Sequence, residues 1–114
     1  NCSDKLLNQI SDKETINGIN ISSPGFYGPQ GRVLRLQLAD PKLNEKIESF
    51  SYKNHKITNY EMESSAIYGL SGLMGHEALT ICLIIANRVT GEANENYYPE
   101  MNNMIKFLLD KLCK

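Results

Sequence analysis

Two glutamates, Glu61 and Glu63, stand on either side of Met62 in the stretch NYEMES. An ionised carboxylate only accepts hydrogen bonds, so it suits neighbouring hydroxyls such as those of a ribose. Each bond to a charged acceptor contributes roughly 1.5–3 kcal/mol. The alternative is that both glutamates stabilise the start of the helix expected next, where negative charge is favoured. The residues alone leave both interpretations open.

A second group of reactive side chains lies in FYGPQGR, a stretch rich in glycine and proline. The ring of Phe26 suits stacking on a planar group. Gln30 offers a donor and an acceptor, whereas Arg32 offers donors only. Together they suit the edge of a pyrimidine, which presents carbonyls and an N–H. The alternative is a surface turn with one solvated arginine.

Each of these segments follows an expected strand, as does a third segment, IIANR. In open α/β sheets, ligands bind beyond the carboxyl ends of the strands. The sequence therefore predicts that the three segments converge on one binding site.

The elements that must position the site alternate between helix and strand. Ser3 and Asp40 are expected N-caps, and Gly75 is an expected helix stop. The run EALTICLIIANR is continuously apolar, as in a central strand covered on both faces. Residues 33–38 suit a strand or the start of a helix. Helices are expected over residues 4–10, 41–50, 64–74 and 100–114, and strands over 19–22, 57–60 and 77–88. This order predicts an α/β fold.

The composition excludes several classes of protein. The 114 residues are enough for one domain or part of one, with 41% hydrophobic and 22% charged residues, and they predict a modest core. The net charge of −1 indicates neither a nucleic-acid nor an anionic-membrane partner. The longest apolar run is too short to cross a bilayer.

The cysteines and histidines indicate no metal site. Three cysteines at wide spacing argue against a disulfide scaffold and a zinc knuckle, and predict a cytoplasmic location. His55 and His76 are too far apart for a metal motif. Because the chain begins at Asn1 and enters an expected helix almost at once, we expect a fragment or a processed product.

The three segments together resemble the nucleoside phosphorylase-I family, and within it the uridine phosphorylase branch. NYEMES is similar to the family's ribose-binding signature. The resemblance implies that Met62 and Glu63 contact the sugar hydroxyls and that Glu61 supports them. FYGPQGR is similar to the segment that reads uracil. There, Phe26 would flank the nucleoside, while Gln30 and Arg32 would bind the uracil carbonyls and N3.

The resemblance extends to the third segment. IIANR is similar to a strand end that lines the base pocket, which makes Ile85 and Ala86 expected pocket residues. Arg88 would adjoin a flexible lid over residues 89–98. The purine branch usually carries an aspartate where this chain has Asn87, and this difference favours a pyrimidine. A purine phosphorylase or a nucleosidase of the same family stays open as an alternative.

The resemblance also implies a fold and a reaction. The fold would be a three-layer sandwich with a mixed central sheet, of which residues 1–114 form the C-terminal part of one domain. The intact enzyme would cleave uridine with inorganic phosphate, giving uracil and ribose-1-phosphate without a cofactor or a metal. Arg32 and Gln30 would stabilise the leaving uracil as catalytic residues. The expected partners are the nucleoside and phosphate substrates, further copies of the same chain in a homo-oligomer, and the missing N-terminal half.

One part of the family pattern is absent. The family builds its phosphate site from glycine and arginine residues in the N-terminal half, and nothing in this chain matches it. A non-catalytic fragment that lacks this site is therefore a further alternative.

Overall fold

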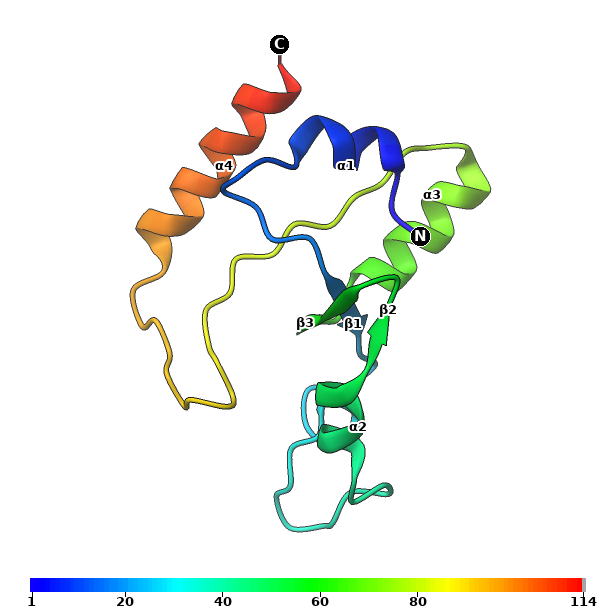
Figure 1. The fold of residues 1–114 in the computed structure, drawn as a ribbon, viewed down its shortest axis with the longest axis vertical. Coiled ribbons are helices and arrows are strands. Elements are labelled where there is room, and N and C mark those ends of the chain that lie inside the picture. Colours follow the sequence, from blue (N-terminus) through cyan, green and yellow to red (C-terminus); the bar gives the residue numbers. More distant parts are fainter. Residues whose placement is uncertain (114) are drawn as a thin grey trace.

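The computed structural model describes residues 1–113, which fold into helices around a small sheet (Figure 1). Helices α1 and α4 lie near one end of the long axis, and α2 lies at the other end. The elements are α1 (Asp4–Ile10), β1 (Ile19–Ser22), the 3-10 helix η1 (Gly28–Gln30), α2 (Leu43–Ser49), β2 (Ser51–Tyr52), β3 (His55–Glu61), α3 (Ser64–Met74) and α4 (Tyr98–Leu112). The predicted α/β class is confirmed.

The sheet is mixed and has the strand order β1-β3-β2. Strands β1 and β3 are parallel, with Ser22 beside Glu61. Strand β2 is antiparallel to β3 and joins it through a tight turn at Lys53 and Asn54, where φ is 48° and 66°. The parallel pairing places the carboxyl ends of β1 and β3 at the same edge. Two of the three segments expected to converge therefore do leave the sheet together.

The predicted helix signals at Ser3 and Gly75 are confirmed. The Ser3 hydroxyl accepts a hydrogen bond from the N–H of Leu6 at 3.2 Å, which caps α1. Gly75 ends α3 with a φ of 71°, a left-handed conformation that glycine adopts without strain. The N–H of His76 donates to the carbonyl of Ser71 at 2.8 Å and completes this helix end.

Two helix boundaries differ from the prediction. Asp40 is not the N-cap of α2, because its carboxylate accepts from the N–H of Lys42 at 3.0 Å and forms a turn before the helix begins at Leu43. Helix α4 begins at Tyr98, two residues earlier than predicted, with Pro99 in its first turn. A proline is favoured there because its missing N–H has no helical partner at that position. The predicted end at Lys114 lies outside the described residues.

The predicted central strand over residues 77–88 is wrong. The segment is irregular in the structure, and its pairing is an isolated bridge between Ala86 and Ala93 in its own loop. A strand requires a neighbour for its backbone hydrogen bonds. Within residues 1–113, the sheet contains β1, β2 and β3, and none of them pairs with this segment. Residues 33–38 likewise form bends, not a strand or a helix.

The hydrophobic core is smaller than the composition predicts. Ile10, at 5% exposure, is the apolar side chain that is buried among the described residues. The radius of gyration is 15.8 Å, against about 13 Å for a compact chain of this length. The accessible surface is 9113 Å², against about 6,300 Å² for a compact monomer of this mass. The chain thus exposes apolar surface that a compact domain would cover.

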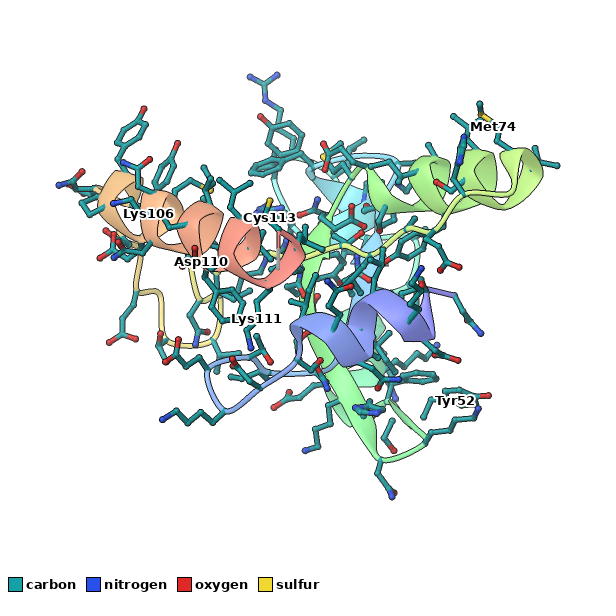
Figure 2. All side chains as sticks on the ribbon, turned by 90° about the horizontal axis from the view of Figure 1, so that it is seen from above. Tyr52, Met74, Lys106, Asp110, Lys111 and Cys113 are labelled. Carbon is teal, nitrogen blue, oxygen red and sulfur yellow. The ribbon has the colours of Figure 1, made fainter. Side chains whose placement is uncertain are left out.

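The apolar contacts that do form join α1 to α4. They border a hollow of about 300 Å³, lined by Leu6, Ile10, Leu79, Ile81, Leu108 and Leu112. An ion pair of 2.6 Å between Lys111 of α4 and Asp12, which follows α1, also joins the two helices. Helix α3 instead exposes Ile67, Leu70 and Leu73, and Figure 2 shows Met74 at its far end, away from α4. No helix of residues 1–113 has the length and apolar character to cross a membrane.

Candidate functional site

The loop after β1 turns Gln30 and Arg32 toward one point. Gly31 lies between them with a φ of 74°, and a Cβ at this position would collide with the side chain of Asn44. Asn44 donates to the Gly31 carbonyl at 3.0 Å and holds the turn. Gln30 is consequently buried, at 4% exposure. Arg32 donates to the Gln30 amide oxygen Oε1 at 2.6 Å and to the main-chain carbonyl of Phe26.

A second arginine reaches the same glutamine. Arg88 donates to Gln30 Oε1 at 2.6 Å and to the Gln30 main-chain carbonyl. Its guanidinium lies 4.4 Å from the ring centre of Tyr60, while that of Arg32 lies 3.7 Å from the ring centre of Phe26. We call these five residues the arginine cluster. From the sequence, Arg88 was expected beside a lid, and no role was expected for Tyr60. The one signal for Tyr60 was its position immediately before Glu61 in the stretch NYEMES.

The arginine cluster concentrates positive charge. Burial and the neighbouring Arg32 lower the pKa of Arg88, but a guanidinium stays protonated in proteins. The ion pairs among residues 1–113 join Lys46 to Asp40 and Lys111 to Asp12, so neither guanidinium is paired with a carboxylate. Two adjacent cations without a counter-charge suit a ligand that develops negative charge.

At the end of β3, the carboxylate of Glu61 is hydrogen-bonded to neighbouring groups of the chain. Its carboxylate accepts from the N–H groups of Glu63 at 2.8 Å and Ser64 at 2.6 Å, and from the Ser64 hydroxyl at 2.5 Å. Ser64, at 3% exposure, also accepts from the side-chain amide of Asn20 at 2.9 Å. We call Asn20, Glu61, Glu63 and Ser64 the glutamate cluster. Glu61 thus stabilises the start of α3, as the simpler interpretation proposed.

Glu63 differs from Glu61 because its carboxylate is free to accept hydrogen bonds from a ligand. Its side chain is exposed and accepts one hydrogen bond, from the N–H of Met62 at 3.0 Å. A carboxylate has room for about four such bonds. Of the two glutamates, Glu63 therefore has acceptor sites left for hydroxyls of a ligand. Met62 lies beside it and is 43% exposed.

The hydrogen bonds at Glu61 set its ionisation. Burial alone would raise the pKa of Glu61, but hydrogen bonds from the Ser64 hydroxyl and from the N–H groups of Ser64 and Glu63 outweigh it. The pKa in the folded chain is therefore below the ordinary value of 4.5. Glu61 consequently stabilises the fold fully above about pH 4.5, and this contribution is lost as the pH falls through the lowered pKa.

Replacing Glu61 with glutamine is expected to lower the free energy of unfolding by about 1 kcal/mol at pH 7, because α3 loses the acceptor at its start. The variant should also lose less stability than the wild type between pH 6 and pH 3. Urea unfolding at several pH values measures both effects. Glu95→Gln, in an exposed loop, is the matched control. Equal acid sensitivity of Glu61→Gln and the wild type would contradict the assignment.

Of the third predicted segment, IIANR, only the last residue lies at the site. Ile85 and Ala86 line an open hollow of about 300 Å³ whose walls come from residues 84–87 and 92–94. That lining includes neither Gln30 nor Glu63. Because residues 77–88 are not a strand of the sheet, their end is not held at the sheet edge. Arg88 is the residue of this segment that joins the arginine cluster.

The two clusters meet where β1 and β3 end. Tyr60 and Glu61 are the last two residues of β3, and the N–H of Ser23 donates to the carbonyl of Glu61 at 2.8 Å. Consecutive strand residues point to opposite faces, so a ligand that touches both clusters must lie beyond the strand end. Within residues 1–113, no group of three or more potential metal ligands is placed to hold an ion.

The chain matches the Phosphorylase superfamily over residues 1–110. It belongs to this family. The predicted relationship to nucleoside phosphorylases is thereby confirmed, and the match includes both clusters of this phosphorylase-superfamily chain. No solved structure gives a significant match to it.

Several curated proteins resemble this phosphorylase-superfamily chain. A uridine phosphorylase of Thermococcus kodakarensis is 36% identical over 81 residues, which cover 66% of this chain and 26% of that protein. Uridine phosphorylase A of Schistosoma mansoni is 33% identical over 90 residues, which cover 77% of this chain and 30% of that protein. A third relative, named inactive uridine phosphorylase B and also from Schistosoma mansoni, is 33% identical over 87 residues. These residues cover 75% of this chain and 29% of that protein. The chain spans less than a third of each relative's length.

Proposed function

We propose that this chain carries the base-binding and sugar-binding sites of a phosphorylase that cleaves uridine with inorganic phosphate. The observation that carries the proposal is the pair of arginines, Arg32 and Arg88, which meet on Gln30 without a carboxylate partner among the described residues. The exposed carboxylate of Glu63 follows the neighbouring strand end. The relatives named uridine phosphorylase support the choice of nucleoside.

In the proposed reaction, a phosphate oxygen attacks C1′ of the ribose as the bond from C1′ to N1 of uracil breaks. The electron pair of that bond passes to uracil, where it spreads onto the carbonyl oxygens. Arg32 and the amide of Gln30 stabilise this charge where it develops. The proton of the attacking hydrogen phosphate passes through solvent to N1 of uracil, so the products are ribose-1-phosphate and uracil. The transition state has oxocarbenium character, as in glycoside cleavage generally.

Glu63 contributes by orientation. Its carboxylate accepts hydrogen bonds from the ribose hydroxyls and turns C1′ toward the phosphate. Glu61 does not contact the sugar in this scheme, because its oxygens are already occupied by Glu63 and Ser64. Instead it fixes the backbone from which Glu63 projects. Phe26, which is 51% exposed, flanks the nucleoside.

The remaining part of a phosphorylase domain is proposed to supply the phosphate site and to cover the exposed apolar surface. Two observations support this. The relatives are more than three times as long as the matched part. The chain also exposes large apolar side chains on α3 and α4, such as Leu73 at 86% and Leu109 at 54%. Completion of a three-layer sandwich and assembly into a homo-oligomer would both bury such residues.

A substrate panel tests the proposed function. The protein, at its full encoded length, is incubated with uridine, inosine or 5′-methylthioadenosine, with and without phosphate. We expect uracil release from uridine that requires phosphate, and little release from the purine nucleosides. Faster release from inosine would identify a purine phosphorylase. Release that needs no phosphate would identify a nucleosidase. Either result would overturn the proposal.

A second candidate is a chain that binds a nucleoside without cleaving it. One of the similar relatives is named inactive, so similarity at this level does not decide between an active and an inactive protein. Uridine binding in calorimetry without uracil release, at saturating phosphate, would favour this candidate.

A further inference from the structure

We propose that Tyr60 is a positioning residue: its ring holds Arg88, and Arg88 fixes the orientation of the Gln30 amide that reads the base. The inference rests on the proposed function and names a residue to which neither the sequence nor the comparisons give a role. It concerns which atoms of Gln30 face a ligand.

The first step is the placement of Arg88. The residue follows an irregular segment that no strand of residues 1–113 holds in place. Its guanidinium lies 4.4 Å from the ring centre of Tyr60, within the range of a cation–π interaction. Tyr60 belongs to β3, where it lies beside Ile21 of the parallel strand β1, and it is partly buried. The paired strand therefore supplies the support that the loop of Arg88 lacks.

The second step is the orientation of the Gln30 amide. Its oxygen Oε1 accepts from Arg32 and from Arg88, each at 2.6 Å. A carbonyl oxygen has two lone pairs, so both acceptor positions are used. The Nε2 group, with two N–H donors, must then face the other way. Gln30 thus presents donors to a ligand, which suit the carbonyl oxygens of a pyrimidine base. In this orientation the amide has no free acceptor for N3–H, so the expected contact of Gln30 or Arg32 with N3 is not formed by these two side chains.

The third step separates the ring of Tyr60 from its hydroxyl. The hydroxyl is buried and has no hydrogen-bond partner among the described residues. A buried hydroxyl without a partner contributes nothing favourable. The ring, in contrast, contacts Arg88. The proposal therefore assigns the positioning role to the ring alone, and phenylalanine should perform it as well as tyrosine does.

The kinetic test compares Tyr60→Leu with Tyr60→Phe in the protein at its full encoded length. Tyr60→Leu should raise the KM for uridine about tenfold, the size of a partly desolvated cation–π interaction. The KM for phosphate should stay unchanged, because phosphate does not contact Gln30. Tyr60→Phe should restore the wild-type KM for uridine. Equal KM values for uridine in both variants, or a matching rise in the KM for phosphate, would overturn the proposal.

A second measurement needs no activity. In protein labelled with ¹⁵N at glutamine, the side-chain amide signals of Gln30 are expected to be sharp and well separated in the wild type and in Tyr60→Phe. They should broaden or shift in Tyr60→Leu, because the amide is no longer held. If all three proteins give the same signals, the positioning role is wrong. If the wild type releases no uracil, the proposed function fails, and the amide signals still decide the role of Tyr60.

Discussion

Replacing Arg32 with alanine is expected to slow uracil release by about 100- to 1,000-fold, the usual cost of losing one donor aimed at developing negative charge. The guanidinium lies over the ring of Phe26 and donates to Gln30, so its loss also frees the amide that faces the base. Steady-state kinetics with uridine and phosphate measure the effect. The loss should appear chiefly in kcat, because the charge exists only as the bond to uracil breaks.

The matched control for this variant is Arg35→Ala. Arg35 lies three residues further along, in an exposed segment outside the arginine cluster. It should retain the kinetics of the wild type. Unchanged kinetics in Arg32→Ala, or an equal loss in Arg35→Ala, would remove Arg32 from the site. In the second case the loss would reflect the overall charge of the chain and not a placed donor.

Replacing Glu63 with glutamine should lower kcat/KM for uridine by about 10- to 100-fold, the value of one or two hydrogen bonds to a charged acceptor. The loss should be similar for 2′-deoxyuridine, because both nucleosides present the same 3′-hydroxyl. The melting temperature should hardly change, since Glu63 accepts one hydrogen bond within the described residues.

Glu61→Gln is the informative comparison for Glu63→Gln. The structure assigns Glu61 to the start of α3 and leaves Glu63 exposed, so the first variant should lose stability and the second should lose activity. If Glu63→Gln altered only the preference between bases, the ribose assignment would be wrong. If it lowered stability as much as Glu61→Gln, Glu63 would be a structural residue.

Local signals in the sequence were sufficient for the parts of the fold that depend on neighbours in the chain. The Ser3 cap and the Gly75 stop rest on interactions within one or two helical turns, which the residue types reveal. The strands predicted at residues 19–22 and 57–60 correspond to β1 and β3. The segments that follow them do leave the sheet at the same edge, as predicted. Their parallel pairing then brings the loop of Gln30 beside the end of β3.

Features that depend on distant partners were not predictable from one sequence. The apolar run over residues 77–88 reads as a strand, but a strand exists only where neighbouring strands supply hydrogen bonds. The contact between Arg88 and Gln30 joins residues 58 positions apart, and the contact between Arg88 and Tyr60 depends on the path of an irregular loop. The division of roles between Glu61 and Glu63 likewise follows from which carboxylate faces the Ser64 N–H.

The most direct test of the central claim measures uracil and ribose-1-phosphate together, after uridine is given to the full encoded chain with and without phosphate. We expect the two products in equal amounts when phosphate is present, and neither when it is absent. Arg32→Ala, tested alongside, should form both products far more slowly. Free ribose as the product, or product formation that is independent of Arg32, would contradict the claim that this strand end stabilises a departing uracil during phosphorolysis.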